Sequence, residues 1–436
     1  MVYLQAPEHH RPVSAPVEHM NTLNTTQPDL KDWRSRLESE GKNPPKAEDL
    51  CWETEPGIRI DPVFEAASLG PEHAYLAGFH RYWASLPRPA RPGIRVSWVQ
   101  DYLPEGLEEE IARAGVDSLY NGFAGSRALY GPQSYREGLR NGPSGLAEAE
   151  TDPVFDSLRE GKWLPGWKEN APLSPSGLWI HASDVHRAGG GPVDELTMAL
   201  RVADEYRKRL TDAGFRAGAG SWKIQLGAGP SFWMEIAKFR AMRLLWMHYT
   251  RQLGLEGIPG FIEAETSTVY WSCSDPDSNL IRHSSEVLSA LLGGADSVLV
   301  HPHTTNQDYA LDALRQAANL VWLPLKESQM EGVFDPASGS YLVEILTHKL
   351  ASAAWSAFVL AQNKPLTEEL EQGKWQEEIA RKAAGLTARY REGKLVLTGA
   401  NHHPSPLSRP CRPLSVHMPE ASPTLSPLMP LVLDAC

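Results

Sequence analysis

Apolar residues in the middle of the chain recur with two different spacings. Val193–Leu210 and Phe232–Leu253 repeat apolar positions every three to four residues, which predicts helices with one buried face. The same spacing predicts helices at Asn279–Leu292, Tyr341–Leu360 and Glu368–Tyr390. Short β-type runs precede or separate several of these helices, and the predicted strands are Ile94–Val99, Asp117–Tyr120, Leu178–Ala182, Trp222–Leu226, Gly260–Ala264 and Asp296–Val300.

This alternation of strands and helices is typical of a parallel sheet with crossover helices. We therefore expect an α/β fold, a (β/α)8 TIM-type barrel over residues 31–395, with a doubly wound sheet as the alternative. Residues 1–30 are polar and aperiodic, which predicts a flexible arm. Residues 396–436 are rich in proline and serine, which predicts a disordered tail in which only the final apolar stretch is a candidate for docking.

Charge and cysteine content narrow the class of protein. A formal net charge of -12 argues against nucleic acid or an anionic membrane as the main partner. The four cysteines lie far apart without CxxC spacing, so neither a disulfide framework nor a structural zinc site is expected. No apolar run is long enough to span a bilayer and no targeting segment is evident. We expect a cytoplasmic protein.

Three segments resemble the methylmalonyl-CoA mutase family. Ser231–Trp246 (SFWMEIAKFRAMRLLW) is similar to a long family helix, Asp275–Val300 to a helix, a Gly-Gly stop and a strand, and Val333–Glu344 to a DP–GSY–E segment. Trp52–Phe64 is a weaker match to an N-terminal strand motif. All four occur in family order. The resemblance implies a (β/α)8 barrel threaded by an acyl-CoA chain, with cobalamin carried against its mouth by a separate domain.

The residues that would perform the family's chemistry depart from its pattern. In Ile180–Gly191 (IHASDVHRAGGG), the position of the family's catalytic histidine falls on Asp184. A carboxylate cannot donate a hydrogen bond to a thioester oxygen unless it is protonated. His186 and Tyr82 are weak candidates for a catalytic role, because neither keeps the family's local sequence.

The segment expected to hold the acyl-CoA is also incomplete. Arg315 matches one of the family's two arginines, but Ala318 stands at the position of the second, which weakens a clamp for phosphate or carboxylate. By resemblance, Thr266 and Ser267 could line the barrel around a pantetheine chain. Arg315, Ser267 and Thr266 are therefore the candidate substrate contacts.

Two short histidine patterns suggest metal binding but have simpler explanations. DVHRAG (Asp184–Gly189) matches DxHxxG, in which the histidine becomes the lower cobalt ligand, yet the motifs that should follow are not evident. His301-Pro302-His303 follows a strand and is best explained as a polar loop at a barrel mouth. We expect this chain to contain no metal site.

Other charged positions give two further expectations. Glu263 and Glu265 should point to one face of a strand, where they could bind a cation or pair with arginines. Lys238, Arg240 and Arg243 on the long helix are expected to be solvated or interface charges.

The resemblance implies the small, non-catalytic subunit of a methylmalonyl-CoA mutase. Its partner would be the large catalytic subunit, which binds adenosylcobalamin and isomerises methylmalonyl-CoA to succinyl-CoA, while this chain alone binds no cofactor. A cobalamin-binding domain is expected to be absent, and whether the barrel admits acyl-CoA stays open. One alternative is a catalytic acyl-CoA mutase chain that works with a separate cobalamin-binding subunit. A second is a non-enzymatic regulatory or binding barrel.

Overall fold

The computed structural model divides the chain into two compact units, Met1–Glu65 and Ala66–Cys436. The described residues are 35, 39, 46–53, 58–61, 64, 68–71, 73, 92–97, 107–121, 128–130, 152–164, 167, 178–216, 222–255, 257–304, 310–404 and 425–434. The predicted arm of residues 1–30 and the candidate Tyr82 lie outside them.

The first unit contains a short 3-10 helix, η2 (Ala47–Leu50), and two short antiparallel strands. These strands, β1 (Trp52–Glu53) and β2 (Arg59–Ile60), belong to the weakest of the family-like segments. Between them, the Arg59 guanidinium donates to the sulfur of Cys51 over 3.0 Å.

The second unit is built on a seven-stranded sheet with the order β5-β4-β3-β9-β8-β7-β6. Its strands are β3 (Gly93–Ser97), β4 (Ser118–Asn121), β5 (Ala128–Tyr130), β6 (Trp179–His181), β7 (Trp222–Ala228), β8 (Gly260–Thr266) and β9 (Ser297–Val300). All neighbours pair in parallel except β4 and β5. Among the described strands, β5 and β6 are the two edges. All six predicted strands are confirmed within a few residues.

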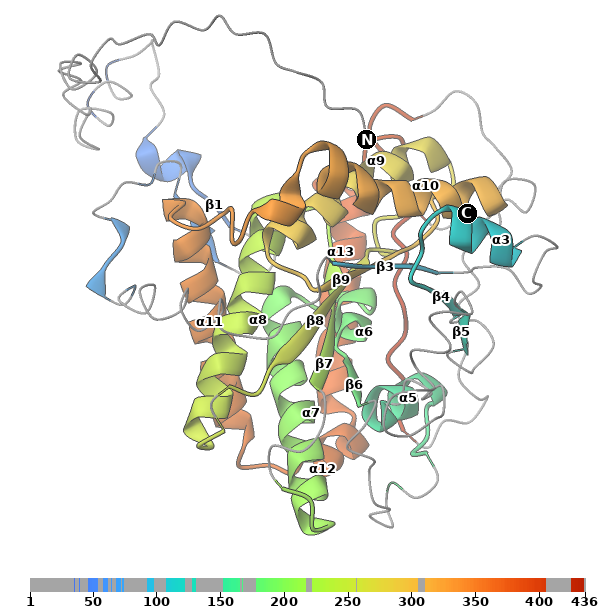
Figure 1. The fold of residues 1–436 in the computed structure, drawn as a ribbon. Coiled ribbons are helices and arrows are strands. Elements are labelled where there is room, and N and C mark those ends of the chain that lie inside the picture. Colours follow the sequence, from blue (N-terminus) through green and yellow to red (C-terminus); the bar gives the residue numbers. More distant parts are fainter. Residues whose placement is uncertain are drawn as a thin grey trace, which may run out of the picture. The chain divides into compact units, whose positions relative to one another are not determined.

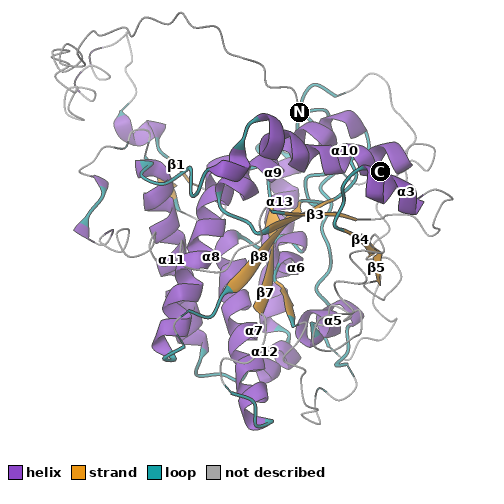
Figure 2. Ribbon diagram, viewed as in Figure 1, coloured by secondary structure: helices purple, strands orange, loops and turns teal. Residues whose placement is uncertain are grey.

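Helices connect and cover these strands (Figures 1 and 2). They are α3 (Leu107–Arg113), α5 (Pro153–Glu160), α6 (Ser183–Arg187), α7 (Pro192–Asp212), α8 (Phe232–Gln252), α9 (Pro276–Leu292), α10 (Ala310–Trp322), α11 (Tyr341–Ala361), α12 (Leu366–Gln372) and α13 (Lys374–Arg391). A π-helical turn, η6 (Leu323–Glu327), and a 3-10 turn, η7 (Met330–Gly332), follow α10. None of the helices in the described part of the chain is both long and apolar enough to cross a bilayer.

The single helix predicted at Glu368–Tyr390 is wrong in one respect. The chain forms two helices there, α12 and α13, which meet at Gly373. This glycine has a φ of 73°, a left-handed conformation that ends α12 and that most other residues adopt only with strain. The periodic pattern of apolar residues continues across Gly373, so this pattern could not predict the break between the two helices.

The two faces of the sheet differ in chemistry. One face carries fully buried aliphatic residues: Ile224 of β7 is in register with Ile262 of β8, and Ala264 of β8 is in register with Val298 of β9. Helices such as α8 and α11 lie together on one side of these strands (Figure 2). The other face carries polar residues, with Gln225 of β7 beside Glu263 of β8, and these are buried as well. Both faces of this sheet are therefore buried, but only one of them is apolar. A sheet that is covered by helices on both sides has two apolar faces.

The three cations on α8 correct an expectation. Lys238, Arg240 and Arg243 were expected to be solvated or interface charges, but all three are buried. Arg240 pairs with Asp335 and, over 2.7 Å, with Glu344 at the start of α11. Because a buried charge must be paired, the arginine of one family-like segment is fixed by two carboxylates of another.

The final apolar stretch of the predicted tail, the part expected to be a candidate for docking, contacts other elements of its unit. Residues 425–434 are ordered against α5, α6 and the loop that follows β8. Leu425, Leu428 and Leu433 are buried there, so leucine burial outweighs the proline and serine content that predicted disorder. The rest of this region is described only as far as residue 404, where Thr398 and His402 form an isolated bridge.

Candidate functional site

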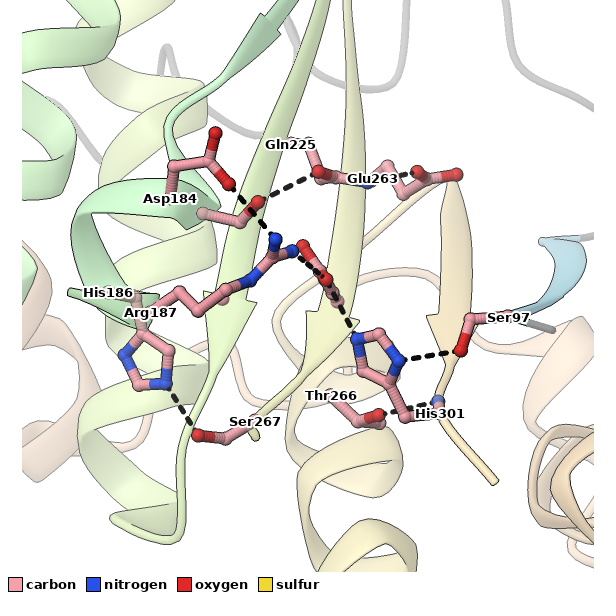
Figure 3. Close-up of polar contacts among 12 residues, drawn as sticks. Ser97, Asp184, His186, Arg187, Gln225, Glu263, Thr266, Ser267 and His301 are labelled. Carbon is pink, nitrogen blue, oxygen red and sulfur yellow. Dashed lines mark hydrogen bonds and ion pairs between the residues drawn. The ribbon is translucent and has the colours of Figure 1, made fainter. Parts of the chain in front are cut away.

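Polar side chains gather where the parallel strands β6, β8 and β9 end (Figure 3). In folds with parallel strands, the loops at the carboxyl ends are where ligands usually bind. We call the side chains of Asp184, His186, Arg187, Glu265 and His301 the carboxyl-end network.

Asp184, which is expected from the sequence to occupy the position of the family's catalytic histidine, is an acceptor for two arginines. Its side chain is 6% exposed. One oxygen accepts from Nε of Arg159 over 2.7 Å, and the other lies 3.2 Å from the Arg187 guanidinium. Asp184 lies in the first turn of α6, directly after β6. Two ion pairs favour the ionised carboxylate, which has no proton to donate.

Glu265 is the centre of the network, and it lies on the same face of β8 as Glu263, as the sequence predicts. Arg187 donates to its carboxylate, and Nε2 of His301 lies 2.8 Å from the same oxygen. Burial alone would raise the pKa of Glu265, but the Arg187 guanidinium and His301 hold it well below its usual range. Since an ionised carboxylate only accepts, His301 donates through Nε2, and its Nδ1 lies 2.6 Å from the hydroxyl of Ser97 on β3.

His186 is partly buried and points away from Asp184 (Figure 3). Its Nε2 lies 2.8 Å from the hydroxyl of Ser267. Burial, reinforced by the positive charge of Lys238, lowers the pKa of His186 to about 3, so the ring is neutral near pH 7. The ring packs against Gly227, where a Cβ atom would fall 2.5 Å from ring carbons. Only glycine therefore leaves room for this histidine.

A second set of buried charges lies behind His186, where α7 and α8 pack against the end of β7. Nζ of Lys238 is 2.8 Å from Glu195, 2.7 Å from Glu235 and 2.5 Å from the carbonyl of Gly227. Burial raises the pKa of Glu195 to about 7, although Lys238 opposes the rise. For Lys238, burial favours loss of the proton, but the two carboxylates outweigh it and raise its pKa. These residues hold the strand on which His186 packs.

α9 contributes another buried acid and histidine. Glu286 accepts from the backbone N–H of Ser267 over 3.0 Å. Burial raises its pKa well above the usual range, which favours the neutral acid. Burial also lowers the pKa of the neighbouring His283 to about 3. Ser267 therefore lies between a neutral histidine, His186, and a carboxyl group that tends to be protonated.

The predicted substrate contacts are only partly brought together. Thr266 and Ser267 are adjacent at the end of β8, and both are buried. The hydroxyl of Thr266 accepts from the backbone N–H of His301 over 2.9 Å. Arg315 instead lies exposed on α10, where its ion pairs run to Asp312 at 3.1 Å and Glu110 at 4.0 Å.

Sequence reasoning missed the two arginines that organise the polar face of the sheet. Arg95 of β3 donates to both oxygens of Glu263 at 2.7 and 2.8 Å, and Gln225 donates to the same carboxylate over 2.8 Å. Arg187 performs the same role for Glu265. For Glu263 and Glu265 the sequence left two expectations open, a bound cation or pairing with arginines, and the structure shows the arginine pairs. One sequence signal could have revealed Arg95. Charged and apolar residues alternate along this strand, which places Arg95 on one face of β3.

His186 does not fit the role of a cobalt ligand that the DxHxxG pattern suggests. Its Nε2 is engaged by Ser267, its ring is pressed against Gly227, and the aspartate of the pattern, Asp184, is held by arginines. Within the described residues, no group of three or more potential metal-binding side chains could hold an ion. His301, from the HPH pattern, is bound to Ser97 and Glu265 instead.

Known proteins resemble this chain over its central part. The sequence model of the family described as Methylmalonyl-CoA mutase matches residues 167–422, more than half of the chain. The methylmalonyl-CoA mutase small subunit of Porphyromonas gingivalis is 32% identical over 220 residues, which cover 49% of this chain and 34% of that protein. The probable methylmalonyl-CoA mutase small subunit of Mycobacterium tuberculosis H37Rv is 33% identical over 285 residues, covering 60% of this chain and 45% of the relative.

A protein named methylmalonyl-CoA mutase, without a subunit designation, is similar as well. The Rhizobium meliloti protein is 33% identical over 186 residues, which cover 40% of this chain and 26% of that protein. The chain thus spans less than half the length of these curated relatives.

Proposed function

The chain belongs to the methylmalonyl-CoA mutase family, and on this premise we propose that it is the small, non-catalytic subunit of a methylmalonyl-CoA mutase. In this role it binds and stabilises a large subunit that converts methylmalonyl-CoA to succinyl-CoA. The names of its relatives from Porphyromonas and Mycobacterium support the assignment to the small subunit.

The state of Asp184 is the observation that carries the proposal. A catalytic chain needs a hydrogen-bond donor at this position to hold the thioester oxygen. Asp184 is an acceptor fixed by Arg159 and Arg187, and no rotation of its side chain supplies a proton. His186 cannot take over without losing Ser267 and the space beside Gly227. The scaffold is kept while the donor is lost.

The sheet order supports a closed (β/α)8 barrel. Reading from β6, the parallel strands follow in the order β6, β7, β8, β9, β3, β4, so the latest strand in the chain pairs with the earliest parallel strand. A doubly wound sheet starts in its middle and grows outward, which does not give this circular order. The polar inner face of Arg95, Gln225 and Glu263 fits a barrel interior lined for a polar chain. The edges of the described sheet are β5 and β6, and closure would join these two ends.

The cofactor of the family is adenosylcobalamin, which we assign to the large subunit. The poor fit of His186 to a cobalt ligand supports this assignment. The complex is expected in the cytoplasm, with neither nucleic acid nor membrane as a partner.

A second candidate is a catalytic acyl-CoA mutase barrel that uses a separate cobalamin-binding subunit. Its support is the Rhizobium relative, whose name carries no small-subunit designation. Under this alternative, His186 or Tyr82 would hold the thioester.

Co-purification distinguishes the two candidates. The tagged chain is co-expressed with a large mutase subunit from the same genome, and the product is analysed by size-exclusion chromatography and visible absorption. We expect a complex that carries the cobalamin spectrum and forms succinyl-CoA, whereas the folded chain alone with adenosylcobalamin shows neither property.

The control is the chain mixed with a small cobalamin-binding protein. Isomerisation of an acyl-CoA by that mixture would contradict the small-subunit role and favour the catalytic alternative. A folded chain that associates with neither partner would leave a regulatory or binding barrel as the better description.

A further inference from the structure

Residues 425–434 (LSPLMPLVLD) cross three separate elements in an extended path, which we call the strap (Figure 1, red). Its backbone N–H groups donate to the carbonyls of Gly161 and Leu158 at the end of α5, of Arg187 at the end of α6, and of Val269 after β8. These four distances are 2.8, 3.1, 2.7 and 3.0 Å, in that order.

The carbonyls that receive these bonds are suited to binding a peptide. The last carbonyls of a helix have no partner within the helix, and Leu158, Gly161 and Arg187 all lie at helix ends. Backbone hydrogen bonds do not depend on the side chain of the donor residue. This arrangement is the one by which extended peptides are recognised along an exposed row of backbone groups.

Burial along the strap follows a three-residue repeat at its start. Leu425 and Leu428 are buried, while Ser426 and Met429 are exposed. A polyproline II helix has three residues per turn, and the prolines at positions 427 and 430 favour it. Leu433 then enters a cluster with Val269, Tyr270, Leu386 and Leu397. The surface beneath the strap thus buries the leucines at positions 425, 428 and 433.

An acidic side chain fixes the far end. Asp434 accepts from the hydroxyl of Ser272 over 2.6 Å, of Tyr390 over 3.0 Å and of Ser274 over 3.3 Å. Three donors that converge on one carboxylate form a specific pocket for an acid.

The strap is directly connected to the carboxyl-end network. Arg187, whose carbonyl it binds, holds Glu265, and the next residue before it is His186. Val269 donates its backbone N–H to the hydroxyl of Ser267, which is the partner of His186. The strap therefore ties the segment that carries His186 to the loop that carries Ser267.

We propose that the surface beneath the strap is a binding groove for an extended peptide with leucines, interspersed prolines and an acidic residue, and that the strap is its intramolecular ligand. Occupied, the groove holds the segments of residues 182–191 and 267–275 together. Vacated, it lets them separate. This proposal is independent of the assigned subunit role.

Hydrogen exchange of the full-length chain tests the coupling. Asp434→Ala removes the acceptor for three hydroxyls, and Leu428→Asp places a charge in an apolar pocket. Each should raise the exchange rate of backbone amides in 182–191 and 267–275 about ten-fold, because local opening is no longer opposed by the strap. Met429→Ala, at an exposed strap position, is the matched control and should leave both segments as in the parent chain. Equal exchange in Asp434→Ala and Met429→Ala would overturn the coupling.

Cleavage of the folded full-length chain tests the groove. A protease site is inserted before Leu425, and a fluorescent LSPLMPLVLD peptide is added before and after cutting. The peptide should bind only the cut chain, where the strap can leave, and its Asp434→Ala version should bind at least about ten-fold more weakly. Binding to the uncut chain with the same affinity, or equal binding of both peptides, would overturn the proposal.

Discussion

Two groups of buried charges in this chain differ in how far their side chains are exposed to solvent. The Arg240 cluster, formed by Arg240, Asp335 and Glu344, connects α8 to the start of α11, and all three side chains are at most 1% exposed. In the carboxyl-end network, the Arg187 side chain remains 26% exposed and His186 is partly buried. Both groups pair arginine with two carboxylates, yet only the second can still meet a ligand or a partner.

The Arg240 cluster belongs to the sequence that identifies the family, whereas the carboxyl-end network lies where the family's chemistry is expected. The residues of the Arg240 cluster lie in two of the family-like segments, where their function is to hold helices together. The carboxyl-end network contains Asp184, the position at which the sequence is expected to depart from the family. The packing of helices can therefore preserve family-like segments, even where the residues at the accessible end of the sheet have changed.

The largest effect is expected from breaking the Arg240 cluster. Arg240→Met leaves two carboxylates buried without their cation, so the free energy of unfolding should fall by about 3–5 kcal/mol. Urea unfolding at pH 7 measures it. Arg240→Met combined with Asp335→Asn and Glu344→Gln should recover much of this loss. A change below about 1 kcal/mol in the single variant would mean that the cluster is not the structural element described here.

Asp184→Asn should lower the free energy of unfolding by a smaller amount, roughly 2–3 kcal/mol. It removes the negative charge from two ion pairs, but the arginines of these pairs keep some contact with water. The mutase activity of the reconstituted complex, assayed below the melting temperature of the variant, should stay within about two-fold of the parent. Arg381→Met, at an exposed position on α13, is the control for both measurements. Loss of activity from folded Asp184→Asn complex would assign Asp184 a catalytic role.

The carboxyl-end region should also respond to pH through His283, whereas the Arg240 cluster contains no histidine. The pKa of His283 is about 3 in the folded chain and 6.5 in the unfolded one. Between these values only the unfolded state binds the proton, so acid favours unfolding. From pH 6.5 to 5, the parent chain should lose about 2 kcal/mol more than His283→Gln.

Unfolding curves of the parent and of His283→Gln at both pH values measure this difference. Glu195 and Glu286, whose pKa values are raised, act with the opposite sign, since acid stabilises the folded form. They are present in both proteins and cancel. Parallel pH dependences would show that His283 is not buried as a neutral ring.

The smallest effect is expected for His186→Gln. Glutamine can still hydrogen-bond to Ser267, and the proposed chemistry takes place on the large subunit, so activity of the complex should remain within about two-fold. A catalytic histidine would instead account for about 10²–10⁴-fold. A loss in that range in a folded complex would favour the catalytic alternative.

The sequence by itself determined the order of strands and helices and the family. Apolar residues that recur every two residues, or every three to four, indicate which side chains are buried. This is because the local geometry of strands and helices places such residues on one face. It placed the six predicted strands, and it placed Glu263 and Glu265 on one face. The same local signal could not show that Gly373 breaks a helix, because the apolar period continues across it.

Only the tertiary structure decided which charges meet. Arg95 and Glu263 are 168 residues apart and Arg240 and Glu344 are 104 apart, so spacing along the chain carries no record of either pair. Lys238, Arg240 and Arg243 look like surface charges in a helix pattern, yet packing buried them beside carboxylates from other elements. The burial of the final leucines was also decided by tertiary structure, because the surface that they contact is assembled from α5, α6 and the loop after β8.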